Sequence, residues 1–124
     1  MPAKALIIAA PRSGSGKTAI TLGIARALAG WGRAVAPAKT GPDYIDPAFL
    51  AAAAGTPAIN LDPWAMPPDM LRGLAKTHGD GHDIVLIEGV MGLFDGAISG
   101  GGSTADLAAM LYLPVILVIA VLLG

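Results

Sequence analysis

The stretch "KALIIAAPRSGSGKTAITLGIARALAG" (residues 4–30) decides the fold that this sequence predicts. It starts with a short apolar run that ends at a turn, which indicates a buried strand over residues 4–10. Apolar residues at helical spacing follow, so we expect a helix over residues 17–30 with Gly30 as its C-terminal cap. A strand, a glycine-rich turn and a helix in this order are the setting that a phosphate-binding loop requires.

The glycine-rich turn departs from the common phosphate-binding loop at one position. That loop has Gly, four residues and then Gly-Lys-Thr, so counting back from Lys17 puts Pro11 where the first Gly is expected. Small residues allow backbone N–H groups to close around phosphates, and the positive end of the helix adds to the attraction. Lys17 would neutralise the β- and γ-phosphates, and Thr18 would bind Mg²⁺. An ordinary glycine-rich turn is the alternative, and the flanking strand and helix favour the phosphate-binding loop.

The rest of the chain continues the alternation of strands and helices. We expect strands at 33–39 and 83–88, helices at 47–54 and 67–77, a glycine-rich loop at 89–103, and then a helix capped by Ser103 or Thr104. Strands that alternate with helices predict an α/β fold, in which a parallel sheet carries helices on its faces.

The last segment, residues 107–123, contains no charged residue and has the length of a short membrane span. Pro114 in its middle and the absence of flanking basic residues argue against a span. The alternative is a helix followed by the β-branched run "PVILVIAV", which indicates a strand buried on both faces. We favour the helix and the strand.

Charged residues gather where the predicted strands end. They are Lys17, Lys39, Asp43, Asp46, Glu88 and Asp95. Ligands of open α/β sheets bind along the carboxyl ends of the strands, so these residues are candidates for a ligand site. Glu88 could supply one of the carboxylates that Mg²⁺ on a triphosphate usually takes, although a solvated acid at a strand end is the alternative.

The segment "KTGPDYIDP" (residues 39–47) places a Lys, two carboxylates and a Tyr directly after a strand. Lys39 could reach the γ-phosphate, and Asp43 or Asp46 could hold metal or position a substrate. Asp46 also suits the cap of the helix after Pro47. From the residues alone we predict a magnesium-dependent enzyme that cleaves a nucleoside triphosphate or transfers its phosphoryl group, with the acceptor left open.

Composition narrows the class of protein. The 124 residues have the length of about one domain, are 54% hydrophobic and 14% charged, and carry a net charge of −1. A net charge this close to zero does not indicate binding to nucleic acid or to an anionic membrane. No Cys occurs, which excludes disulfides and thiol nucleophiles from these residues. The N-terminus does not resemble a signal peptide, so we expect a cytoplasmic protein.

Four motifs together resemble a known family. They are "APRSGSGKT" (10–18), "KTGPDYIDP" (39–47), "NLDPWAM" (60–66) and "EGVMGLFDG" (88–96), and they resemble the cobyrinic acid and hydrogenobyrinic acid a,c-diamide synthases. The resemblance runs in order from about residue 4 to residue 118, and Pro11 is the residue that this family has in its loop. It implies a P-loop NTPase-type, dethiobiotin-synthetase-like fold of the amidoligase group.

The resemblance also implies a reaction. ATP phosphorylates the a- and c-acetate carboxylates of a corrinoid, cobyrinate or hydrogenobyrinate, in the synthesis of cobalamin. Ammonia that a glutaminase domain releases from glutamine then displaces each phosphate. A carboxylate is a poor electrophile until its oxygen becomes part of a phosphate leaving group, and phosphoryl transfer depends mostly on positioning and charge neutralisation.

The resemblance assigns roles by motif position. ATP would be held by Gly14, Ser15, Gly16, Lys17 and Thr18. Mg²⁺ would be held by Thr18, Asp46 and Glu88, with Lys39 near the transferred phosphate, so Lys17, Lys39, Asp46 and Glu88 are the catalytic candidates. Asp43, Tyr44 and Asp95 would orient the corrinoid or its acyl phosphate. Asn60, Asp62 and Trp64 form a signature without an assigned role.

Two departures from the family shape our expectations. The family's glutaminase uses a nucleophilic Cys, which these residues lack, and the family's segment after "LPVILV" contains an Asp and a Ser where this chain has "IAVLLG". We therefore expect residues 1–124 to be the N-terminal part of the ATP-binding domain, without the C-terminal glutaminase domain, and inactive alone. The oligomeric state is left open, with a homodimer as one alternative.

Other function classes remain as alternatives. Cobyric acid synthase and dethiobiotin synthetase share the phosphate-binding loop, but the first should have another loop in place of "GPDYIDP" and the second should lack "EGVMGLFDG". A partitioning-type ATPase usually has an additional Lys early in the loop, where this chain has Pro11-Arg12-Ser13. The motif "NLDPWAM" favours metal-free hydrogenobyrinate over cobalt-containing cobyrinate as the substrate.

Overall fold

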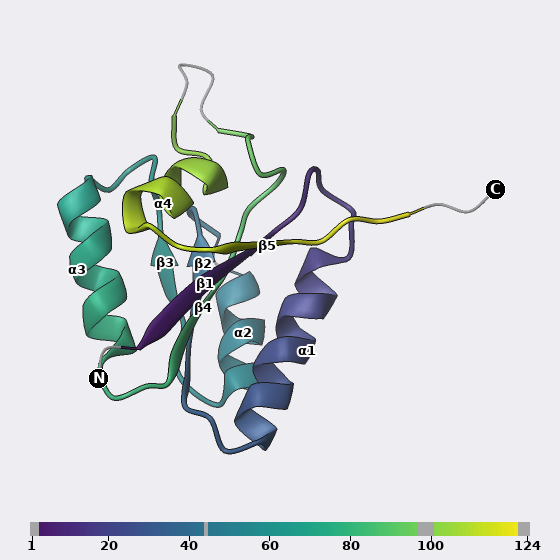
Figure 1. Ribbon diagram of the computed structural model, residues 1–124, viewed down its shortest axis with the longest axis vertical. Helices are drawn as coiled ribbons and strands as arrows, with labels where there is room; N and C mark the ends of the chain where they lie inside the picture. The colour runs from purple at the N-terminus through teal and green to yellow at the C-terminus, as the bar shows by residue number, and fades with distance from the viewer. Residues whose placement is uncertain (1–2, 44, 97–100, 122–124) are drawn as a thin grey trace.

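The computed structural model describes residues 3–43, 45–96 and 101–121. Within these residues, five strands form one parallel sheet in the order β3-β2-β4-β1-β5 (Figure 1). The strands are β1 (Lys4–Ala9), β2 (Val35–Thr40), β3 (Ile59–Leu61), β4 (Ile84–Glu88) and β5 (Val115–Leu117). The helices are α1 (Lys17–Gly30), α2 (Asp46–Ala54), α3 (Pro68–Gly79) and α4 (Thr104–Leu111). The predicted α/β fold with a parallel sheet is confirmed.

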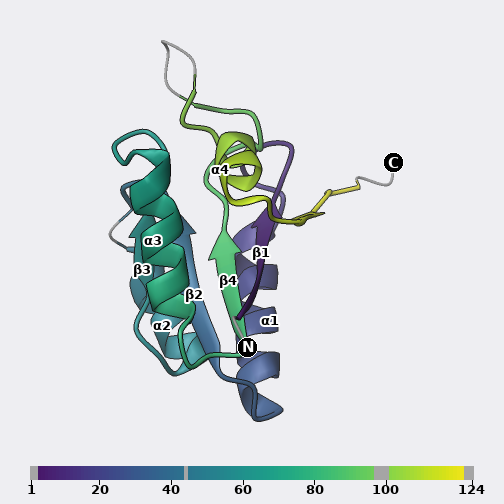
Figure 2. The ribbon, with the colours of Figure 1, turned by 60° about the vertical axis from the view of Figure 1, so that its left-hand side comes forward.

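The helices cover both faces of the sheet (Figure 2). Successive side chains of a strand point to opposite faces, and β4 in the centre is apolar on both. Val85 and Ile87 belong to the core beneath α3 and α4, whereas Leu86 belongs to the core beneath α1 and α2. This burial explains why the run "IVLI" is continuously apolar rather than alternating.

The register of the strands brings three strand ends to one level. Glu88, the last residue of β4, is aligned with Ile8 of β1 on one side and with Lys39 of β2 on the other. The loop after β1 leads to Lys17, and the loop after β2 leads to Asp46. Residues that are far apart in the sequence therefore meet at the carboxyl edge of the sheet.

The helix ends confirm one expectation and correct another. Ser103 caps α4, because its hydroxyl accepts a hydrogen bond from the Asp106 N–H while the Asp106 carboxylate accepts one from the Ser103 N–H. Gly30, by contrast, was wrongly expected to be the C-terminal cap of α1. It is still helical, Trp31 is the cap, and Gly32 takes the left-handed conformation with φ of 82°.

The outer strands differ most from expectation. β3 was not predicted, because three residues are too few to show a periodicity. β5 was expected to be buried on both faces, and this is wrong. It pairs with β1 along one side at the edge of the described sheet, and Ile116 and Leu117 remain 46% and 42% exposed.

The uncharged C-terminal segment forms a helix and a strand, as favoured above, within residues 107–121. None of the helices in the described part of the chain combines the length and the hydropathy that crossing a bilayer requires.

Candidate active site

The predicted phosphate-binding loop joins β1 to α1, in the expected order of strand, turn and helix. Gly14 and Gly16 both have φ of 81°, in the left-handed region that glycine adopts without steric cost. Gly16 is the N-cap of α1, and no side chain accepts a hydrogen bond from the first N–H groups of that helix. The start of α1 can therefore direct its N–H groups and the positive end of its dipole at an anion. Ser15 stabilises the turn by donating to the Arg12 carbonyl, at 3.0 Å.

Two lysines meet at the tip of β4. Lys17 Nζ donates to the Gly89 carbonyl oxygen at 2.7 Å and lies 2.9 Å from Glu88 Oε1. Lys39 Nζ donates to the same Gly89 oxygen at 3.0 Å and lies 3.5 Å from Glu88 Oε1. Both lysines and Glu88 are buried. Such a buried group of charges is stable only while its members neutralise one another.

Burial lowers the pKa of Lys17 below its ordinary value of 10.5, because the ammonium group loses contact with water. The hydrogen bond and the negative charge of Glu88 oppose this effect, whereas the positive charge of Lys39 adds to it. An additional anion beside Lys17, such as a phosphate, would stabilise the protonated form.

The segment after β2 contributes both of its carboxylates to the site. Asp46 Oδ2 lies 3.2 Å from Lys39 Nζ, which links α2 to the charges at the tip of β4. The expectation that Asp46 caps α2 is wrong. Asp46 is the first residue of the helix, and Asp43 Oδ1 instead accepts from the backbone N–H groups of Ile45 and Asp46, at 2.8 and 3.1 Å.

The pKa of Asp43 lies below its ordinary value. Partial burial opposes ionisation of the carboxyl group, but the hydrogen bonds from the N–H groups of Ile45 and Asp46 and the positive charge of Lys39 outweigh this effect. Asp43 is therefore held in its charged form.

The donor set around Glu88 fits Mg²⁺ carried by a nucleotide. Glu88 Oε1 accepts from Thr18 Oγ1 at 2.7 Å, whereas Glu88 Oε2 is buried and has no hydrogen-bond partner in the described part of the chain. No cluster of three or more His, Cys, Asp or Glu side chains suited to a metal occurs among the described residues. Mg²⁺ on a triphosphate takes only one or two protein carboxylates. Glu88, whose Oε2 has no partner among the described residues, meets that requirement, and the Thr18 hydroxyl beside it is a further oxygen ligand.

A cavity of about 300 Å³ adjoins these charges. It is lined by residues 12–18, Lys39, Asp43, Asp46, Val90 and Met91. The structure thus brings the predicted nucleotide-binding residues together with Lys39, Asp43 and Asp46, while Glu88 lies buried among these charges.

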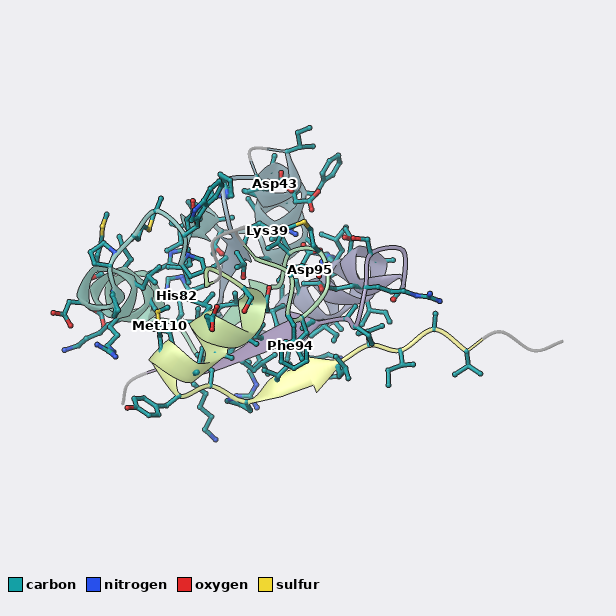
Figure 3. The ribbon with its side chains drawn as sticks, turned by 90° about the horizontal axis from the view of Figure 1, so that it is seen from above. Lys39, Asp43, His82, Phe94, Asp95 and Met110 are labelled. Atoms are coloured by element: carbon teal, nitrogen blue, oxygen red, sulfur yellow. The ribbon has the colours of Figure 1, made fainter. Side chains whose placement is uncertain are left out.

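Two predicted substrate residues are not placed in the lining of this cavity. Asp95 lies near the same rim, which Figure 3 shows from above, but its Oδ2 accepts from the Gly92 N–H at 2.9 Å and closes a turn of the loop after β4. Tyr44 lies outside the described residues.

Sequence reasoning missed two features of the site. The Gly89 carbonyl is one, since a backbone acceptor has no side-chain signature; the signal was the Gly after Glu88, where a Cβ would lie 2.8 Å from Thr104 Cγ2. Asn60 is the other. Its Nδ2 donates to the carbonyl oxygens of Gly41 and Asp43, at 2.8 and 2.7 Å. The signal was an Asn, a residue depleted in strands, between Ile59 and Leu61.

Comparison with known proteins assigns this architecture to a family. The sequence pattern described as "CbiA: CobQ/CobB/MinD/ParA nucleotide binding domain" matches residues 6–123. The chain belongs to the CbiA family. The phosphate-binding loop, Lys39 and the tip of β4 all lie inside the matched region, so the CbiA domain accounts for every part of the candidate site.

Three curated relatives of this CbiA domain carry the name hydrogenobyrinate a,c-diamide synthase. The chain is 56% identical over 117 residues to a hydrogenobyrinate a,c-diamide synthase of Brucella ovis, 58% over 114 residues to one of Sinorhizobium sp, and 56% over 124 residues to one of Mesorhizobium japonicum. These alignments cover 94%, 92% and 98% of the chain but only 27%, 26% and 28% of the relatives. The CbiA domain described here thus spans about a quarter of their length.

Proposed function

We propose that these residues form the ATP-binding and acceptor-binding part of an enzyme that converts the a- and c-acetate carboxylates of hydrogenobyrinate to amides, in cobalamin biosynthesis. The observation that carries the proposal is that Lys17, Lys39 and Asp46 line one cavity and that both lysines are paired with buried Glu88. The names of the relatives support the choice of substrate.

The first step in this proposal is phosphoryl transfer to the acceptor. A carboxylate oxygen of the corrinoid attacks the γ-phosphorus of ATP, the bond from that phosphorus to the β,γ-bridging oxygen breaks, and ADP leaves with the electron pair. The N–H groups at the start of α1 bind the phosphates, and Lys17 and Lys39 neutralise the charge that develops on them. Bound Mg²⁺, held by Thr18, Asp46 and Glu88, would add to this neutralisation.

The second step replaces the phosphate with nitrogen. Ammonia attacks the acyl carbon, the carbon–oxygen bond to phosphate breaks, and the phosphate leaves with a proton from the nitrogen. The 124 residues contain no Cys, so in this proposal the ammonia is released from glutamine by a glutaminase outside these residues. The negative charges of Asp43 and Asp46 beside the cavity favour a neutral nucleophile over a second anion.

The corrinoid itself is proposed to lie against the mouth of the cavity. Asp43, Tyr44 and Asp95 would orient its peripheral groups, and Asp43 is suited to this task because it remains charged. Carboxylates of the substrate are repelled by Asp43 unless a cation lies between them, which directs the reacting acetate toward Lys39 and the phosphate.

The test uses the product of the complete reading frame. That protein is incubated with glutamine, ATP and MgCl₂ and with hydrogenobyrinate or cobyrinate, and the products are followed by mass spectrometry. We expect two successive amidations, dependent on ATP and faster with hydrogenobyrinate. Omission of ATP is the control. Amidation that proceeds without ATP, or ATP hydrolysis that no corrinoid stimulates, would contradict the proposal.

A further inference from the structure

Asn60 connects the short strand β3 to the segment that carries the carboxylates of the site. It is aligned with Lys39 of β2, so its side chain emerges beside the Lys39 side chain on the same face of the sheet. Its Nδ2 lies 2.8 Å from the Gly41 carbonyl oxygen and 2.7 Å from the Asp43 carbonyl oxygen. Both partners are carbonyl oxygens, which only accept, so the amide nitrogen and not the amide oxygen must face them.

A third hydrogen bond completes this attachment. The N–H of Gly41 donates to the carbonyl oxygen of Leu61, at 2.9 Å. Residues 41–43, which we call the acceptor turn, are thus bonded to β3 at both ends. Gly41 has φ of 85°, a conformation that lets the chain leave β2 sharply.

The acceptor turn in turn sets the position of both carboxylates. The Asp43 side chain accepts from the N–H groups of Ile45, the N-cap of α2, and of Asp46, its first residue, and Asp46 reaches Lys39. Both Asp43 and Asp46 line the cavity, whereas Asn60 does not. The hydrogen bonds of the Asn60 side chain go to the turn and not to the charged groups, so Asn60 acts on the cavity through the turn.

We propose that Asn60 is a positioning residue, which holds the acceptor turn so that Asp43 and Asp46 face the reacting carboxylate and phosphate. This inference rests on the proposed function. Asn suits this task better than Ser, Thr or Asp. Its planar NH₂ group offers two donors to two carbonyls, a hydroxyl offers one, and the carboxylate of Asp would place a negative charge against both oxygens.

The test compares Asn60→Asp with a matched control in the product of the complete reading frame. The control is Thr56→Val, which removes a hydrogen bond from Thr56 Oγ1 to the Val35 carbonyl at the opposite end of β2. Kinetics with hydrogenobyrinate, affinity for a non-hydrolysable ATP analogue, and hydrogen exchange at the amides of Ile45 and Asp46 are measured for each protein.

For Asn60→Asp we expect kcat/KM for hydrogenobyrinate to fall about 100-fold, the loss that small misplacement of a reacting group produces. Affinity for the ATP analogue should stay within about twofold, because the phosphate-binding loop keeps its own hydrogen bonds. The amides of Ile45 and Asp46 should exchange faster. Thr56→Val should match the wild type in all three measurements.

Three outcomes would overturn the role of Asn60. One is wild-type kinetics in Asn60→Asp; another is an equal loss of affinity for the ATP analogue, which would indicate general disruption. If Asn60→Asp does not fold, Asn60→Ser, which keeps one donor, replaces it, and failure of both to fold would show that Asn60 supports the whole sheet. A wild-type protein that does not amidate hydrogenobyrinate overturns the proposed function instead.

Discussion

The ammonium group of Lys17 lies 2.9 Å from Oε1 of Glu88, although the two residues are 71 positions apart in the sequence. The hydroxyl of Thr18 donates to the same oxygen. The two residues that would bind phosphate and Mg²⁺ are thus hydrogen-bonded to the carboxylate at the tip of β4. A triphosphate in the loop would compete with Glu88 for both groups, and Glu88 would then be available to a cation.

Replacement of Glu88 by Gln should reduce the effect of Mg²⁺ on nucleotide binding. The amide keeps the size of the side chain but removes the negative charge that attracts Mg²⁺. We expect MgCl₂ to strengthen binding of a non-hydrolysable ATP analogue in the wild type, and this enhancement to fall more than about tenfold in Glu88→Gln. Isothermal titration with and without MgCl₂ measures it. An unchanged enhancement would show that Glu88 does not hold the metal.

Removal of the Lys39 charge should destabilise the protein. Lys39→Met removes the cation that pairs with Asp46 and leaves buried Glu88 with Lys17 as its one cationic partner among the described residues, and breaking a buried ion pair in this way costs about 3 kcal/mol. The exposed Lys4 provides the control, since Lys4→Met should change the free energy of unfolding by less than about 0.5 kcal/mol. Urea denaturation compares the two. Equal effects of the two substitutions would contradict the importance of the buried charges.

Gly89 should tolerate no side chain. A Cβ there would lie 2.8 Å from Thr104 Cγ2 and 3.1 Å from the Ile8 carbonyl oxygen, so Gly89→Ala should destabilise the protein by about 2 kcal/mol. Thr104→Ser removes the Cγ2 and should recover part of that loss. Gly23, in α1, has open space around it, and Gly23→Ala should stabilise by about 0.5 kcal/mol. Thermal unfolding measures all three, and a Gly89→Ala variant as stable as Gly23→Ala would contradict the packing described here.

The charge of Asp43 should make a pH-dependent contribution to stability. Its pKa is lower in the folded protein than its ordinary value of 3.8, so the contribution is fully present above pH 3.8 and is lost as the pH falls through the folded-state pKa. The difference in free energy of unfolding between wild type and Asp43→Asn should therefore shrink when the pH is lowered from 7 to below 3.8. Urea denaturation at both values measures it. Thr56→Val changes no charge, so its free energy of unfolding should differ from that of the wild type by the same amount at both pH values. If the difference for Asp43→Asn instead grows at low pH, the charge of Asp43 does not stabilise the folded protein.

Much of the central fold could be predicted because each element carries its own signal. The strand β4 is an uninterrupted apolar run, and α1 covers residues 17–30 as its spacing indicates. The outer elements follow from tertiary context instead. β3 is too short for a pattern, and the exposure of β5 depends on its neighbours in the sheet, which the run "PVILVIAV" does not encode.

The site follows the same division. The position of the site at the carboxyl edge of the sheet could be predicted. Parallel strands end at one edge, and charged residues follow those ends in the sequence. The individual pairings could not. Whether the Asp43 or the Asp46 carboxylate accepts from the N–H groups at the start of α2 depends on the local backbone, and the function of Asn60 depends on two carbonyl groups that any sequence would contain.

The oxygen that Lys17 and Lys39 share belongs to the main chain. Alanine scanning replaces side chains and leaves this atom in place, so a mutational survey would attribute the meeting of the two lysines to Glu88 alone. Chemical synthesis that converts the amide after Gly89 to an ester weakens that oxygen as an acceptor and also removes the Val90 N–H, which donates to Thr104 Oγ1 at 3.0 Å, so comparison with Thr104→Val is needed to separate the two losses. Natural substitutions also change only side chains. The carboxylates of this site can therefore change while the Gly89 carbonyl oxygen, which accepts from both lysines, stays in place.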